Sequence, residues 1–73
     1  MKLEGIVKEY NGFNGKIVDK FGDSYLLLKE EIVDDKIINK LDVVTFVSEG
    51  YKINSIDGKI ARFVRKKEKK KSK

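Results

Sequence analysis

The sequence contains no cysteine, no histidine, no proline and no tryptophan in its 73 residues. The absence of cysteine excludes a disulfide, and without histidine the chain also lacks the usual ligands of a structural zinc site. A chain this short buries only about 60% of the surface that it exposes when unfolded. Its core must therefore come from Leu, Ile, Val, Phe and Tyr alone, and we expect one domain.

Long apolar runs are also missing from the chain. No stretch approaches the length of roughly 18 residues that a membrane-spanning helix requires. Near the N-terminus, Glu4, Gly5, Lys8 and Glu9 interrupt any apolar core of a signal peptide. Because disulfides are rare in the reducing cytosol, the lack of cysteine agrees with a cytoplasmic protein. We expect no association with a membrane.

The net charge of +5 is unevenly distributed. Residues 65–73 hold seven basic residues and one acid, Glu68, which gives this segment a charge of +6. Residues 1–64 hold ten basic and eleven acidic residues, so the expected folded body carries a charge of −1. A basic domain face is the usual sign of nucleic-acid binding, but this composition indicates only a basic arm.

Short runs rich in β-branched and aromatic residues alternate with Gly, Asn and Asp, which is typical of a small sandwich or barrel. In the first run Leu3, Gly5 and Val7 alternate with mostly charged residues, which predicts one apolar face. The two Asn-Gly pairs within residues 11–15 predict a turn, because both residue types tolerate positive φ. We expect five strands, over residues 2–10, 16–20, 24–28, 42–48 and 59–65.

Two segments do not follow the strand pattern. Residues 29–40 combine apolar residues at helical spacing with Asp34, Asp35 and Asn39, and we expect a loop with one or two helical turns. Residues 66–73 contain no apolar side chain that could offset the entropy cost of ordering them. We therefore expect the domain to cover residues 1–65 and residues 66–73 to form a disordered, lysine-rich tail.

Four short motifs resemble those of the cold-shock domain family, in the same order and with similar spacing. Residues 5–11 (GIVKEYN) resemble the first strand of that family, and residues 23–27 (DSYLL) resemble the third. Residues 42–46 (DVVTF) resemble the fourth strand, and residues 61–64 (ARFV) resemble the segment that closes the domain. The resemblance covers about residues 2–65. It implies an all-β, five-stranded OB-fold Greek-key barrel with a long connection between strands three and four.

The resemblance also implies binding of single-stranded nucleic acid on aromatic side chains of strands two and three. Few of those aromatics are present here. Glu9 stands where the family has an exposed tryptophan, and Leu27 stands at the position of a histidine. The second strand lacks the family's aromatic residues. Tyr25 keeps an aromatic residue at a matching position of the third strand, and Tyr10 matches a phenylalanine of the first.

A nucleic-acid site needs flat side chains that stack on bases and cations that follow the phosphates; each stacked base contributes roughly 1–3 kcal/mol. We predict that Tyr25 is the main stacking residue, with help from Tyr10 and Phe13. The alternative is that the two tyrosines cover the barrel edge and Phe13 fills a loop. The predicted phosphate contacts, besides the tail, are Lys8, Lys16, Arg62 and Arg65.

No pattern in the sequence predicts catalysis. The pairs Glu30-Glu31 and Asp34-Asp35 could be imagined as metal ligands, but hard cations need six or more oxygens in a defined geometry, and a solvated loop is the simpler interpretation. Nucleophile–base and phosphate-loop patterns are absent. We expect a monomeric, non-enzymatic protein without a cofactor, whose partner is single-stranded RNA or DNA. Two alternatives stay open: a protein-interaction module that has lost base stacking, and an RNA-associated barrel of the S1 type.

Overall fold

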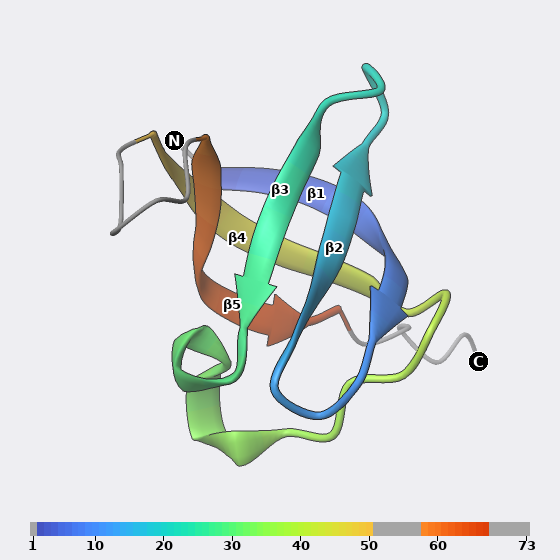
Figure 1. The fold of residues 1–73 in the computed structure, drawn as a ribbon, viewed down its shortest axis with the longest axis vertical. Coiled ribbons are helices and arrows are strands. Elements are labelled where there is room, and N and C mark those ends of the chain that lie inside the picture. The colour runs from blue at the N-terminus through green and yellow to red at the C-terminus, as the bar shows by residue number, and fades with distance from the viewer. Residues whose placement is uncertain (1, 51–57, 68–73) are drawn as a thin grey trace, which may run out of the picture.

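The computed structural model describes residues 2–50 and 58–67. Its elements are β1 (Lys2–Tyr10), β2 (Asn14–Asp19), β3 (Ser24–Leu28), the 3-10 turns η1 (Lys29–Glu31) and η2 (Val33–Asp35), β4 (Val43–Gly50) and β5 (Lys59–Lys66). The strands close into a barrel in the order β1-β2-β3-β5-β4 (Figure 1). Only β3 and β5 are parallel; the other neighbours are antiparallel. The structure thus confirms the all-β class and has the connectivity of an OB-fold barrel.

The predicted strands agree closely with the observed ones. β1 and β3 have the predicted bounds, and the predicted helical turns between β3 and β4 are present as η1 and η2. β2 begins two residues earlier than predicted, because Asn14 and Gly15 already pair with Leu28 and Leu27 of β3. The segment that joins β4 to β5 includes residues 51–57, which lie outside the described residues.

The end of β5 corrects the predicted domain boundary. Lys66 belongs to the strand and pairs with Val44, and the backbone N–H of Lys67 donates to the Val43 carbonyl at 2.8 Å. Both residues were expected in the tail, but backbone pairing with β4 orders them although they contribute no apolar side chain. Residues 68–73 of the predicted tail lie outside the described residues.

One face of each strand supplies the core. In β1 the alternation is as predicted: Gly5 and Val7 are buried and Leu3 is half-buried, whereas the residues between them are exposed. Gly5 is needed where β2 lies across β1, because a Cβ at this position would lie 2.6 Å from Cγ2 of Ile17. The side chains that are almost completely buried are Val7, Ile17, Leu27, Val44, Phe46, Ile60 and Val64.

The connection between β3 and β4 closes one end of the barrel. Ile32 forms an isolated parallel bridge with Val64 of β5, and both Ile32 and Ile38 are buried in the core. Ile37 and Leu41 of the same connection point to solvent and are largely exposed. Within residues 2–50 and 58–67, no helix has the length and hydropathy of a membrane span.

Candidate nucleic-acid interface

The loop between β1 and β2 holds Phe13 in an exposed position. The side chain of Asn11 caps this loop: its Oδ1 accepts hydrogen bonds from the backbone N–H groups of Phe13, at 2.8 Å, and Asn14, at 2.9 Å. The carbonyl of Phe13 accepts a further bond from the N–H of Lys29 at 3.0 Å, which ties the loop to η1. Although its backbone is held at both ends, the Phe13 side chain is 71% exposed. The prediction that its ring can meet a ligand is compatible with this geometry.

Two predicted cations lie on the same hairpin as Phe13. Lys16 of β2 is exposed and stands between Glu9 of β1 and Leu26 of β3 in the strand register. Lys8 is exposed at a β-bulge in β1, where the register with β2 shifts between Val7 and Glu9. The β1–β2 hairpin therefore presents one aromatic ring and two lysines. Glu9 opposite Lys16 offsets part of their positive charge.

Tyr10 is only half-buried and packs its ring against the core. Burial raises the pKa of its hydroxyl above the ordinary value of 10.0, and the negative charge of Glu30 raises it further. Tyr10 thus contributes to the barrel edge, in agreement with the alternative considered for it.

Tyr25 corrects the predicted site, because its side chain is 4% exposed and belongs to the core. Its ring makes an edge-on contact with Phe46, with 4.9 Å between the ring centroids. Its hydroxyl donates to Oδ2 of Asp19 at 2.8 Å. Burial is the main cause that raises the pKa of Tyr25 to about 12, and the bond to Asp19 adds to it. The ring is therefore not available as the stacking platform that the sequence predicted.

Asp19 organises the turn between β2 and β3, a role that the sequence reasoning missed. Its Oδ1 accepts hydrogen bonds from the backbone N–H groups of Phe21 and Asp23, both at 2.9 Å. Burial on its own would raise the pKa of the Asp19 carboxyl, but the bonds from Tyr25 and from the backbone lower the pKa below 3.8. Asp is a typical first residue of such a turn, so the segment Asp19-Lys20-Phe21-Gly22 carried a sequence signal for the role of Asp19.

The two predicted arginines lie on β5, which is not a neighbour of β1 or β2 in the barrel. Arg62 forms ion pairs with Glu49, Nη1 to Oε1 2.8 Å, and with Glu31, Nε to Oε1 3.4 Å. Its charge is therefore already compensated within the fold. Arg65 is exposed and stands opposite Thr45 of β4. The structure does not bring either arginine into the β1–β2 hairpin.

Two further exposed aromatic residues were not predicted as site residues. Phe21, in the β2–β3 turn, is 76% exposed, and Nζ of Lys20 lies 5.6 Å from its ring centroid. Phe63 of β5 is exposed with a φ of 54°, a backbone conformation that bulky residues rarely adopt. It lies where the β4–β5 register shifts, and the Arg62 guanidinium is 5.9 Å from its ring centroid. A strand pattern alone does not reveal such a register shift.

In the part of the chain that the structure describes, no group of three His, Cys, Asp or Glu side chains is arranged to hold a metal ion. Comparison with models of protein families and with curated proteins finds no match to this chain.

Proposed function

We propose that the protein binds single-stranded RNA or DNA weakly and with little sequence preference, through the β1–β2 hairpin. The observation that carries this proposal is the exposed ring of Phe13, which is 71% exposed on a loop held by the Asn11 side chain and by a hydrogen bond from the N–H of Lys29. A ring on an anchored loop loses little freedom when a base stacks on it. On the basis of the four sequence motifs, we also propose that the chain is a member of the cold-shock domain family.

In this proposal Phe13 stacks on one base, while Lys8 and Lys16 contact the phosphates beside it. Half-buried Tyr10, the last residue of β1, adds apolar contact. One aromatic stack and a few cations correspond to a Kd in the range of nonspecific binding, roughly 10⁻⁴ to 10⁻⁶ M at physiological salt. The basic segment 65–73, with its charge of +6, adds attraction that depends on salt but carries no selectivity.

The experiment is an amide chemical-shift titration of the isotope-labelled chain with oligo-dT and oligo-U. The proposal expects the largest shifts at residues 8–16, and weaker binding when Phe13 is changed to Ser. Phe21→Ser is the matched control, because Phe21 is equally exposed but lies at the other end of β2. Shifts confined to residues 65–73 would contradict the stacking role and leave only a nonspecific polyanion contact.

A second candidate function is a protein-interaction module without base stacking, for which the burial of Tyr25 is the specific support. Because Tyr25 points inward, the outer face of β2 and β3 presents three half-buried aliphatic side chains, Val18, Leu26 and Leu28, beside the exposed Lys16. An aliphatic face suits a protein partner better than a nucleic-acid base. Under either function we propose a monomeric, cytoplasmic, non-enzymatic protein.

A further inference from the structure

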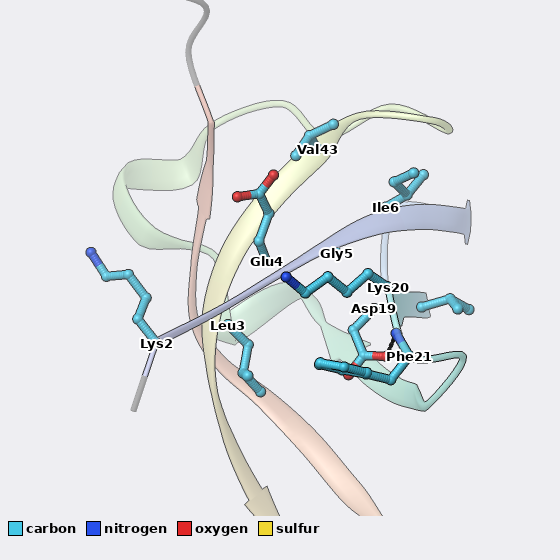
Figure 2. A pocket seen from close by; sticks show the side chains of 10 residues that line it. Lys2, Leu3, Glu4, Gly5, Ile6, Asp19, Lys20, Phe21 and Val43 are labelled. Carbon is cyan, nitrogen blue, oxygen red and sulfur yellow. Dashed lines mark hydrogen bonds between the residues drawn. The ribbon is translucent and has the colours of Figure 1, made fainter.

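A groove of about 430 Å³ lies along the N-terminal half of β1, at the end of the barrel where β2 turns away (Figure 2). Leu3 and the ring of Phe21 lie on one side of β1 in this view, and Glu4 and Val43 lie on the other. The groove is far from the Phe13 loop, because Phe13 precedes β2 and Phe21 follows it. Its apolar lining comes from Leu3, Ile6, Val18, Phe21 and Val43.

The first three residues of β1, Lys2–Glu4, pair with β4 on one side but have no partner in β2 on the side that faces this groove. The N–H of Val7 donates to the Asp42 carbonyl at 2.9 Å, so the backbone groups of Val7 face β4. Since these groups alternate along a strand, those of the even-numbered residues of β1 face β2. β2 ends at Asp19, which is paired with Gly5. The N–H groups of Lys2 and Glu4 therefore point into the groove, where they meet no backbone acceptor among the described residues.

A second hydrogen bond supports the same assignment from the other strand. The N–H of Asp19 donates to the Asp23 carbonyl at 3.0 Å, so Asp19 faces β3 and the preceding residue, Val18, faces β1. Val18 is the partner of Ile6, which places the backbone groups of Ile6 on the β2 side. Glu4 and Lys2 follow by alternation. An exposed row of such groups is a template for another strand.

The exposed charged side chains around the groove are Lys2, Lys20, Lys67 and Glu4, which together carry a charge of +2, whereas Asp19 is buried. Glu4 and Asp19 are the two carboxylates of the lining, and both already have partners: Glu4 accepts from Nζ of Lys67 at 3.1 Å, and Asp19 accepts from Tyr25 and from the backbone of its turn. Both lysines of the lining are in Figure 2, where the Lys2 side chain lies at the N-terminal end of β1 and the Lys20 side chain lies in front of the strand near Gly5. A partner that complements this positive charge carries acidic side chains.

We infer that the groove binds an extended peptide segment of another protein, with acidic residues, which adds as a strand to the free edge of β1. Carbonyl groups of the peptide accept from the N–H groups of Lys2 and Glu4. An apolar side chain of the peptide packs between Leu3 and Phe21, and acidic side chains meet Lys2 and Lys20. Backbone hydrogen bonds supply affinity and the apolar contact supplies selectivity in this mode of recognition. The inference does not depend on nucleic-acid binding, which uses the other end of β2.

The test is a titration of the isotope-labelled full chain with a synthetic peptide of about ten residues, in which Val and Thr alternate and Asp stands near each end. We expect amide shifts at Lys2–Ile6 and Val18–Phe21 and about tenfold slower hydrogen exchange of the Glu4 N–H in the saturated complex. The same peptide with Lys in place of Asp should bind about tenfold more weakly. Shifts outside these two segments, or equal binding of both peptides, would overturn the inference.

Two variants separate strand addition from other contacts. Glu4→Pro removes an N–H that faces the groove and should weaken peptide binding about tenfold, whereas Glu4→Ala removes the same carboxylate, keeps the N–H and should bind the acidic peptide at least as tightly as the unchanged chain does. Phe21→Ser should also weaken binding about tenfold and does not rely on the folding of the proline variant, because Phe21 is 76% exposed. Phe13→Ser is its matched control.

Other occupants of the groove give distinct results, each of which contradicts the inference. If the amide chemical shifts of Lys2–Ile6 change with protein concentration and do not change when the peptide is added, the edge of β1 binds a second copy of the chain. Shifts there with oligo-dT, but none with the peptide, would assign the groove to nucleic acid. If Phe13→Ser does not weaken oligonucleotide binding, the proposed nucleic-acid site is wrong, but the result with the peptide still stands.

Discussion

The hydroxyl of Tyr25 donates a hydrogen bond of 2.8 Å to Oδ2 of Asp19, and this pair links the core of the barrel to its β2–β3 turn. The other carboxylate oxygen of Asp19 holds the backbone N–H groups of Phe21 and Asp23. One buried phenol and one carboxylate thus stabilise the turn that exposes Phe21. The same bond keeps the Tyr25 ring away from solvent, which moves the candidate nucleic-acid site to the β1–β2 hairpin.

Tyr25→Phe should make stability less sensitive to alkaline pH. The folded-state pKa of Tyr25 is about 12 and its ordinary value is 10.0, so the protonated phenol stabilises the fold. This contribution is complete below pH 10.0 and is lost as the pH rises through about 12. The variant should be less stable at neutral pH, and the two chains should converge in the alkaline range. Urea unfolding across this range, followed by far-ultraviolet circular dichroism, measures both effects. If the free energies of unfolding of the two chains differ by the same amount at every pH, this prediction is wrong.

Asp19→Asn should change how the stability of the protein depends on pH in the acid range. The pKa of the Asp19 carboxyl is lowered below 3.8 in the folded protein, so the ionised form stabilises the fold. That stabilisation is present above pH 3.8 and is lost as the pH falls through the pKa that Asp19 has in the folded protein. The variant should therefore be less stable at neutral pH, with a difference that narrows in acid. Thermal unfolding at a series of pH values tests this. Asp23→Asn, in the same turn, is the control for the loss of one carboxylate charge.

Phe13→Ser and Lys16→Gln should weaken oligonucleotide binding in different ways. Loss of one stacked ring should cost roughly 1–3 kcal/mol at every salt concentration. Loss of one phosphate contact should instead reduce the slope of log K against log salt by about 0.7. Fluorescence anisotropy with labelled oligo-U at several salt concentrations separates the two effects. If Phe13→Ser changes only the slope, the ring does not stack.

Gly5→Ala should destabilise the barrel by about 1–3 kcal/mol, as overpacking in a close-packed interior typically does. The added Cβ would lie 2.6 Å from Cγ2 of Ile17 and 2.9 Å from the Val18 carbonyl oxygen, and a backbone oxygen moves less readily than a side chain. Ser24→Ala, at an exposed position of β3, should stay within about 0.5 kcal/mol. Guanidinium unfolding of both variants gives the comparison. Equal stability of the two would show that β1 and β2 can separate at this crossing.

The side-chain period of two predicted most of the barrel from local sequence. In β1 the alternation of Leu3, Gly5 and Val7 with exposed residues identified the strand, its bounds and its inward face. The Asn-Gly pairs of residues 11–15 identified the turn between β1 and β2. β3 was harder, because residues 25–28 are apolar on both faces and no alternation indicates which side points inward. The candidate role of Tyr25 depended on that choice, so it could not be decided from the sequence.

The sequence by itself determined the five strands, the turns between them and the concentration of positive charge at the C-terminal end, because these depend on neighbouring residues. Tertiary structure alone decided which side chains meet across strands. It buried Tyr25 against Phe46, paired Arg62 with Glu31 and Glu49, and left Lys2 and Glu4 without a partner on the β2 side, where β2 turns away. Such contacts join residues far apart in the chain. They follow from the register and closure of the barrel, which no local pattern encodes.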